Sequence, residues 1–209
     1  MTTEQTTALK PAKLILEHDS DVENPCGQEE GWGWVVYSFN RRHTNFKDPF
    51  EFLKRDGSGA NVGIQRRLDC GTAFLLSCYE HSGCSWSLKG EGFQCQWDTT
   101  QYAGIMIWQG KSKDAGKTVK EREERARKAI SVYSDWANGT CYYFRLEDMG
   151  GEELDSCGGF IGDNDLEAAV LESIKRHEVE VTEVVGEAEW IWKYIKPNDS
   201  KPAKAPETT

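Results

Sequence analysis

The amino-acid sequence predicts an α+β fold in which a largely antiparallel sheet carries two main helices packed on it. Short apolar and β-branched runs, bounded by turn residues, recur along the chain and indicate strands. Two longer segments show the periodicity of amphipathic helices. These signals are mixed without a regular β–α–β alternation, and the sequence contains no internal repeat. This pattern is typical of an α+β domain rather than of a doubly wound parallel sheet.

The length of 209 residues fits a single domain, which we expect over residues 13–196. Residues 1–12 and 197–209 are rich in Thr, Lys, Pro and Ser and are predicted to be disordered tails. They contain too few apolar side chains to offset the entropy lost on ordering.

The first half of the chain is predicted to consist mainly of strands. Apolar and β-branched runs indicate strands at 13–17, 34–39, 73–80, 84–88 and 103–108. His81-Ser82-Gly83 form the turn of a hairpin between the third and fourth of these strands. A short helix is expected from Pro49 to about Arg55, because proline is favoured at the first helical position.

The second half of the chain contains the two main helices. Residues 117–137 contain three Glu residues that each precede an Arg or Lys by four positions, and an apolar stripe runs along the same segment. Asn138-Gly139 end this helix. Strands at 141–146 and 154–161 form a hairpin around residues 149–151. Residues 163–165 cap a second helix over 166–176, and a strand broken near Gly186 follows over 179–195.

Composition excludes several classes of protein. A mean hydropathy of −0.66 and the lack of an 18-residue apolar run exclude a transmembrane helix, and we expect no membrane partner. The polar first ten residues do not resemble a secretory signal. Seven cysteines, an odd number without a Cys-x-x-Cys spacing, indicate free and mostly buried thiols in a reducing cytoplasm.

The net charge of −10 is unevenly distributed. Residues 129–195 sum to −11, whereas residues 41–67 and 111–128 each sum to +4. An overall negative charge argues against a generic nucleic-acid binder, although the two basic islands leave local nucleic-acid binding open. The acidic region is either a solvated face that maintains solubility or a surface for a basic partner. The surface residues expected in the second case are Glu152, Glu153, Asp163, Asp165, Glu167 and Glu172.

A catalytic role, if there is one, is expected for His81, Asp98 and Asp155, which offer a general base and carboxylates for a hard metal ion. The hypothesis requires these three side chains to converge on one pocket. No glycine-rich phosphate-binding loop and no serine nucleophile elbow occur in the sequence, and no cofactor is predicted.

The spacing Cys78-x2-His81-x2-Cys84 is compatible with zinc, which binds thiolate and imidazole ligands. Side chains alternate between the two faces of a strand, so Cys78 and Glu80 face one way while Tyr79 and His81 face the other. This geometry works against a shared zinc site at these positions.

Other polar side chains are weaker candidates for binding. Asp19 and Asp21 follow the first strand with a spacing that could hold Mg²⁺ or Ca²⁺, but without the pattern of an EF-hand loop. A small-molecule site would draw on the following binding candidates: Arg41, Arg42, His81, Trp97, Asp98 and Ser156.

Five short motifs occur in an order that resembles a group of uncharacterised small accessory proteins of tailed bacteriophages and prophages. They are Glu17-His18-Asp19 with Asn24-Pro25, Asn40-Arg41-Arg42-His43, Tyr79-Glu80-His81-Ser82-Gly83, Cys95-Gln96-Trp97-Asp98 and Asp155-Ser156-Cys157-Gly158-Gly159-Phe160-Ile161-Gly162. His43 stands where that group usually has an aromatic residue, and Gly158 where it usually has tryptophan. The resemblance implies a viral protein that acts in the cytoplasm of a bacterial host.

Three functional hypotheses follow. The first is an accessory protein of phage origin that binds a host protein, such as a defence factor, through the acidic surface and inhibits or redirects it. The second is a small metal-dependent enzyme that acts on nucleotides or nucleic acid. The third is a protein that sequesters a small molecule such as a nucleotide. The sequence leaves the oligomeric state open.

Overall fold

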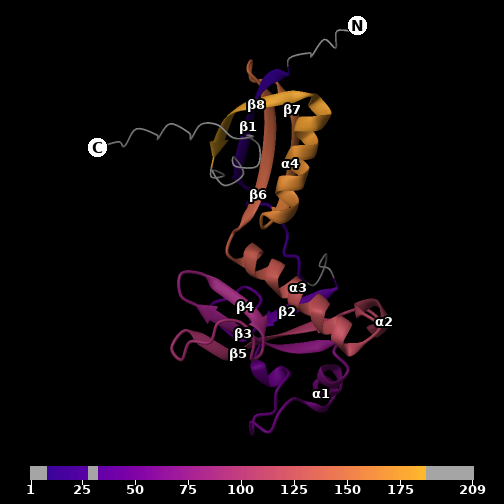
Figure 1. The fold of residues 1–209 in the computed structure, drawn as a ribbon. Helices are drawn as coiled ribbons and strands as arrows, with labels where there is room; N and C mark the ends of the chain where they lie inside the picture. The colour runs from indigo at the N-terminus through magenta and orange to yellow at the C-terminus, as the bar shows by residue number, and fades with distance from the viewer. Residues whose placement is uncertain (1–8, 28–32, 187–209) are drawn as a thin grey trace, which may run out of the picture. The chain divides into compact units, whose positions relative to one another are not determined.

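The computed structural model describes residues 9–27 and 33–186, and its architecture is α+β, as the sequence predicts (Figure 1). The described residues contain two four-stranded sheets and four α-helices. They belong to two compact units: unit 1 comprises Met1–Asp19 and Tyr142–Thr209, and unit 2 comprises Ser20–Cys141. Unit 2 is therefore inserted into the sequence of unit 1, whereas the sequence analysis expected a single domain over 13–196.

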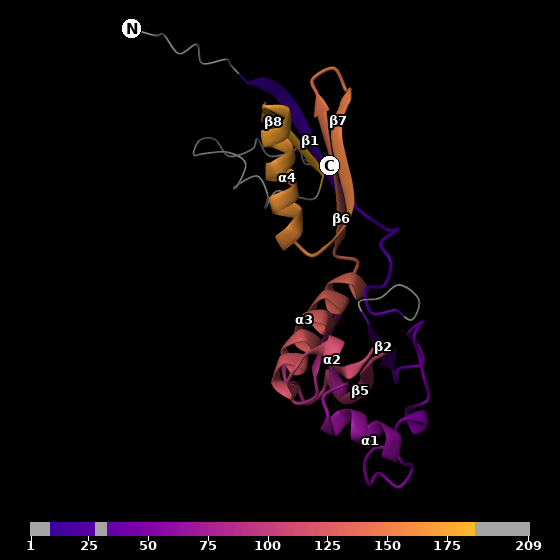
Figure 2. The ribbon, with the colours of Figure 1, turned by 90° about the vertical axis from the view of Figure 1, so that its right-hand side faces the viewer.

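Unit 2 is built on an antiparallel sheet with the strand order β2-β5-β3-β4. The strands are β2 (Trp34–Ser38), β3 (Ala73–Glu80), β4 (Cys84–Leu88) and β5 (Thr99–Trp108). The main helix, α3 (Val119–Ala137), lies against this sheet (Figure 2). Its Ala126, Ile130 and Tyr133 are buried in a core that includes Leu76 and Met106 of the sheet.

A second core lies on the opposite side of the same strands. There Ala73, Ile105 and Ile107 of the sheet pack with Phe52 and with the partly buried Leu68 of α1 (Val62–Asp69). Alternate residues along β3 and β5 thus serve different cores, as the two-residue period of a strand requires. The short helix α2 (Ser112–Ala115) precedes α3.

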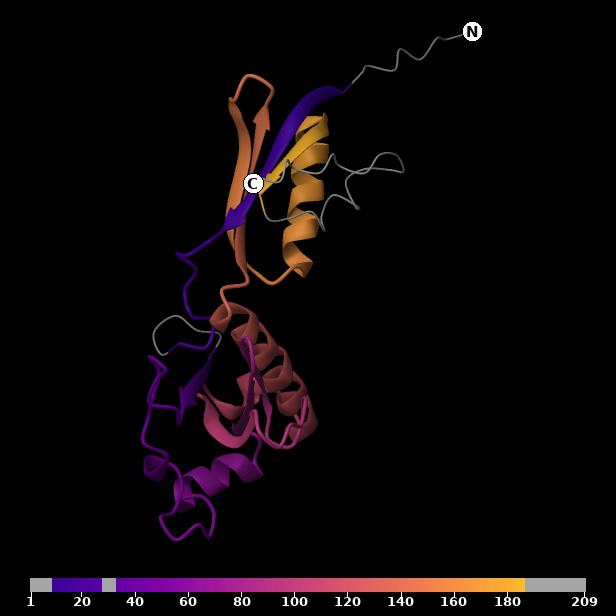
Figure 3. The same cartoon turned by 90° about the vertical axis from the view of Figure 1, so that its left-hand side faces the viewer.

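Unit 1 contains a mixed sheet with the order β7-β6-β1-β8 and one helix (Figure 3). Its elements are β1 (Lys10–His18), β6 (Cys141–Asp148), β7 (Glu153–Ile161), α4 (Asn164–His177) and β8 (Val179–Gly186). β1 pairs antiparallel with β6 and parallel with β8. Leu166 and Val170 of α4 are fully buried against Leu14, Phe144 and Leu146 of the sheet.

Several predicted boundaries are wrong. β1 begins at Lys10 and Ala12 is fully buried, so residues 10–12 are strand rather than tail. The helix expected from Pro49 to Arg55 is a single 3-10 turn, Pro49–Glu51, because the chain reverses through a turn in which Gly57 donates to the carbonyl of Lys54. α1 and α2 were not predicted.

Other boundaries agree with the sequence. β3 and β4 match the predicted ranges, and α3 begins two residues later than expected, where the Thr118 hydroxyl accepts a hydrogen bond from the Glu121 N–H. The tail expected at 197–209 and the strand expected beyond Gly186 lie outside the described residues. No helix among the described residues has the length and apolar character needed to cross a membrane.

Candidate functional site

The formal charge differs between the two units. Unit 1 contains 9 basic and 19 acidic residues, whereas unit 2 contains 16 of each. Unit 1 therefore carries the whole net charge of −10, and unit 2 is neutral. The basic islands noted in the sequence belong to unit 2, where acidic residues balance them.

The six predicted acidic residues lie at exposed or partly exposed positions of unit 1. Glu152 and Glu153 stand at the turn between β6 and β7, and Asp163, Asp165 and Glu167 surround the start of α4. Carboxylates in the first turn of a helix interact favourably with the helix dipole, which explains the acidic start of α4 locally.

Two of the acidic side chains are engaged within unit 1. The Ser156 hydroxyl donates to Glu153 at 2.8 Å, and Arg176 donates to Glu172 at 3.0 Å. An exposed hydrogen bond and an exposed ion pair are both weak, so both carboxylates remain available to a partner. The C-cap of α4 adds the exposed carboxylate of Glu178, and β8 adds those of Glu180 and Glu183.

The three residues proposed for catalysis are only partly brought together. In unit 2, His81 Nδ1 lies 3.7 Å from Asp98 Oδ2, and the His81 side chain is 70% exposed. Asp155 belongs to unit 1, where the Ser173 hydroxyl donates to its carboxylate at 2.6 Å and Arg176 lies 3.4 Å away. The Ser173 hydrogen bond and the positive charge of Arg176 lower the pKa of Asp155. Asp155 thus has structural partners of its own.

The predicted binding residues Arg41, Arg42 and Trp97 are exposed in unit 2. The Arg41 guanidinium lies 5.9 Å from the centre of the Phe46 ring, a cation–π contact within the same loop. The Trp97 side chain is among the most exposed large hydrophobic groups, at 86%.

Asp19 and Asp21, the weak candidates for a metal site, fall in different units. The Asp19 carboxylate accepts a hydrogen bond from the Gly159 N–H of β7 at 2.8 Å. A Cβ atom at Gly158 would lie 2.8 Å from the same carboxylate and 3.2 Å from the Cβ of Tyr143. This crowding favours glycine over any larger residue at position 158.

Unit 2 also contains an open pocket of about 540 Å³ that the sequence did not indicate. Its walls are mainly apolar, and Lys54 and Arg55 stand at its rim beside Leu53, Leu68 and Tyr102. The residues named for a small-molecule site in the sequence analysis do not line this pocket.

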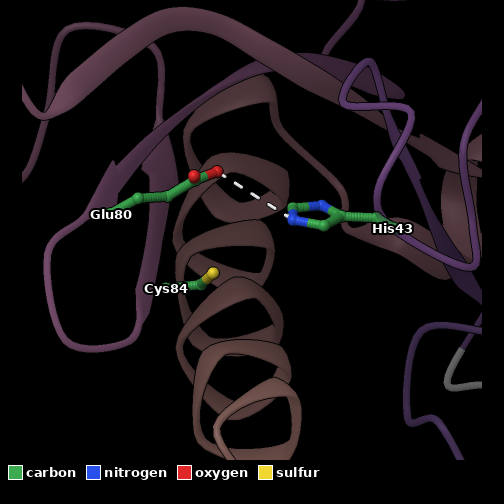
Figure 4. Close-up of side chains that lie close together, drawn as sticks. All are labelled: His43, Glu80 and Cys84. Carbon is green, nitrogen blue, oxygen red and sulfur yellow. Dashed lines mark ion pairs between the residues drawn. The ribbon is translucent and has the colours of Figure 1, made fainter.

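A cluster of three potential metal ligands lies elsewhere in unit 2 (Figure 4). Glu80 at the end of β3 and Cys84 at the start of β4 are paired across the hairpin, and His43 comes from the loop after β2. One donor atom of each residue lies within 4.8 Å of the other two. The His43 Nε2 and Glu80 Oε1 atoms face each other at 3.9 Å.

Neighbouring side chains hold the members of this cluster in place. His43 Nδ1 is hydrogen-bonded to the Ser38 hydroxyl at 2.8 Å, and the imidazole packs edge-on against the Trp86 ring, with ring centres 5.7 Å apart. The Asn138 amide binds both the N–H and the C=O of Cys84 at 2.8 Å each.

Burial and charge disfavour the thiolate form of Cys84 and of its neighbour Cys78. Burial, followed by the negative charge of Glu80, raises the pKa of Cys84, and a hydrogen bond from Cys78 offsets this only in part. Burial also raises the pKa of Cys78. A strongly nucleophilic thiolate requires a depressed pKa, so the arrangement does not favour a catalytic cysteine.

The sequence analysis considered Cys78, His81 and Cys84 together as a zinc motif and did not associate His43 with Glu80 and Cys84. His43 is 37 positions before Glu80, and no local spacing connects them.

The chain matches no protein-family model, no curated protein and no solved structure.

Proposed function

We propose that the protein is a phage-encoded accessory protein that binds a basic surface of a host defence protein through unit 1 and thereby inhibits or redirects it. The observation that carries this proposal is the segregation of charge: unit 1 has a net charge of −10 and unit 2 of zero. The phage resemblance of the sequence motifs supports the proposed setting in a bacterial cytoplasm.

Charge segregation of this size favours fast association with an oppositely charged partner. Complementary potentials raise association rates by about 10- to 1,000-fold, and this gain falls steeply with ionic strength. The acidic residues of unit 1 occupy turns, an edge strand and a helix start, where they are accessible. They need no rearrangement of the unit 1 core to make contact.

The metal-dependent enzyme built from His81, Asp98 and Asp155 is less well supported. His81 and Asp98 stand on an open surface, and Asp155 is bonded to Ser173 and Arg176 in unit 1. A general base must lie within hydrogen-bond reach of its substrate, and the open surface around His81 and Asp98 does not enclose one.

The test compares two triple neutralisations. Glu152→Gln, Asp165→Asn and Glu180→Gln remove three exposed charges from unit 1, whereas the matched control Glu51→Gln, Asp114→Asn and Glu124→Gln removes three exposed charges from unit 2. A host protein captured by the wild-type chain is purified, and its association rate with each variant is measured at low and high salt.

We expect the unit 1 variant to associate at least about tenfold more slowly at low salt, and the control to match the wild type. Raising the salt concentration should reduce the difference. Equal rates for the two variants, or a rate that salt does not change, would contradict the proposal.

A further inference from the structure

We propose that His43, Glu80 and Cys84 form a zinc-binding site in unit 2, with a water molecule as the fourth ligand. The site does not depend on the proposed function of unit 1. It rests on three donor groups from a loop and two strand ends that meet within 4.8 Å of one another (Figure 4).

The donor set favours zinc over other common cations. An imidazole nitrogen, a carboxylate oxygen and a thiolate sulfur are the three ligand types of protein zinc sites. Calcium and magnesium prefer oxygen ligands alone, so His43 and Cys84 would disfavour both. One glutamate and one cysteine thiolate also balance the two positive charges of the ion.

All three separations lie within 4.8 Å, so a contraction of up to about 1.5 Å brings the donor atoms to the spacing of a tetrahedral ion. Bond lengths of about 2.0–2.1 Å to nitrogen or oxygen and about 2.3 Å to sulfur place tetrahedral ligands roughly 3.3–3.8 Å apart. His43 Nε2 and Glu80 Oε1 are 3.9 Å apart. The Glu80 side chain is 43% exposed and can rotate to close the remaining gap.

Residues around the ligands match the outer shell of a metal site. Metal-binding histidines usually donate their other N–H group to a neighbour, which fixes the tautomer and the ring orientation. Ser38 occupies that position at His43 Nδ1 and leaves Nε2 directed at Glu80. Asn40 donates to Glu80 Oε1 at 3.4 Å, and Asn138 fixes the backbone of Cys84.

Cys78 is the alternative partner of Cys84. Its thiol donates a hydrogen bond to Cys84, but it is fully buried and is not one of the three groups whose donor atoms lie within 4.8 Å of one another. We therefore assign Cys78 to the core and the fourth position to water. When the ion binds, the proton of the Cys84 thiol is released to solvent and the thiolate bonds to zinc.

The experiment uses the full-length chain, reduced and freed of metal with a chelator. Zinc binding is measured by competition with a chromophoric chelator, and Co²⁺ is added separately as a spectroscopic probe. We expect one zinc ion per chain with a Kd below about 10 µM. Bound Co²⁺ should show the charge-transfer absorption of a thiolate ligand.

Variants identify the ligands. His43→Ala, Glu80→Gln and Cys84→Ser should each weaken zinc binding by more than about 100-fold, whereas Ser38→Ala, which removes only the outer partner, should weaken it about 10- to 100-fold. The control His81→Ala should bind as the wild type does, and Cys78→Ala, which loses only a hydrogen bond to Cys84, should weaken binding no more than Ser38→Ala does. Circular dichroism of each variant establishes that it is folded.

Three outcomes would overturn the proposal. Wild-type protein that binds no zinc at 10 µM rules the site out. Loss of binding in His81→Ala but not in His43→Ala would assign zinc to the hairpin turn instead. Loss of binding in Cys78→Ala together with an unaffected Glu80→Gln would indicate a dithiol site formed by Cys78 and Cys84.

Discussion

Side chains at the C-terminal end of α3 hydrogen-bond to backbone groups at the edge of the unit 2 sheet. We therefore expect Ser134→Ala to lower the free energy of unfolding measurably. β4 is the last strand of its sheet, so its outer N–H and C=O groups lack a strand partner. The Ser134 hydroxyl accepts a hydrogen bond from the Trp86 N–H at 2.9 Å and donates to the Ile130 carbonyl at 3.0 Å. One helical turn later, Asn138 binds the backbone of Cys84.

The expected loss follows from the burial of this contact. Trp86 is 4% exposed and Ser134 is 9% exposed, so water cannot replace the lost hydroxyl. A buried N–H without a partner costs about 1–3 kcal/mol. Alanine is a better helix former than serine by about 0.5 kcal/mol, which leaves a net destabilisation of roughly 0.5–2.5 kcal/mol.

Ser131→Ala is the matched control, because Ser131 is exposed on the same helix. It should gain about 0.5 kcal/mol of helix propensity and lose no buried contact, so the two variants should differ by about 1–3 kcal/mol. Urea unfolding followed by tryptophan fluorescence measures this difference, and six of the eight tryptophans belong to unit 2. Equal unfolding midpoints for the two variants would refute the edge-closing role of Ser134.

Three further predictions concern packing and pH. Gly104→Ala should lower the stability of unit 2 by about 1–3 kcal/mol, because its Cβ would lie 2.4 Å from the Tyr37 carbonyl oxygen; an unchanged thermal midpoint would contradict this. The hydrogen bond from Ser173 lowers the pKa of Asp155, so this carboxylate stabilises the fold above its unfolded pKa and the contribution is lost as pH falls. In urea titrations, Asp155→Asn should therefore lower the free energy of unfolding more at pH 7 than at about pH 3. An equal loss at both pH values would count against the Ser173–Asp155 hydrogen bond. Burial raises the pKa of Cys26 to about 12 in the folded protein, whereas the thiol of the unfolded chain ionises near pH 8.5. The free energy of unfolding should therefore fall as the pH rises from about 8.5 towards 12. Cys26→Ala should make this fall smaller when unfolding is measured at alkaline pH.

The elements that the sequence predicted well are those with a strong local signal. β3 combines apolar and aromatic residues over eight positions, and α3 has both an apolar stripe and ion pairs at i,i+4 spacing, of which Glu121–Arg125 and Glu123–Arg127 form. α1 has no fully buried residue and contains Gly63, so its helical pattern is weak. It is stabilised mainly by the contact of its partly buried apolar residues with the sheet.

Local sequence signals likewise predicted only part of the candidate zinc site. Strand alternation correctly placed Tyr79 and His81 on one face, where their rings stack with centres 6.3 Å apart, and left Glu80 on the other. Strand pairing then sets Glu80 opposite Cys84. The approach of His43 depends on the loop after β2, which is fixed by tertiary hydrogen bonds that include Ser38 and that no local periodicity reveals.

The insertion of unit 2 couples the folding of the two units through chain entropy. β1 and β6 are paired up to His18 and Tyr142, with 122 residues of unit 2, Ser20–Cys141, between the strands. Closing a flexible loop of that length costs about 3 kcal/mol more than closing a four-residue turn. Within unit 2, however, the Trp136 indole donates to the Val22 carbonyl at 2.8 Å, which ties the start of the insert to its last helix. Once unit 2 is folded, most of the entropic cost of closing this loop no longer opposes the pairing of β1 with β6. Unit 1 therefore depends on unit 2 for part of its stability.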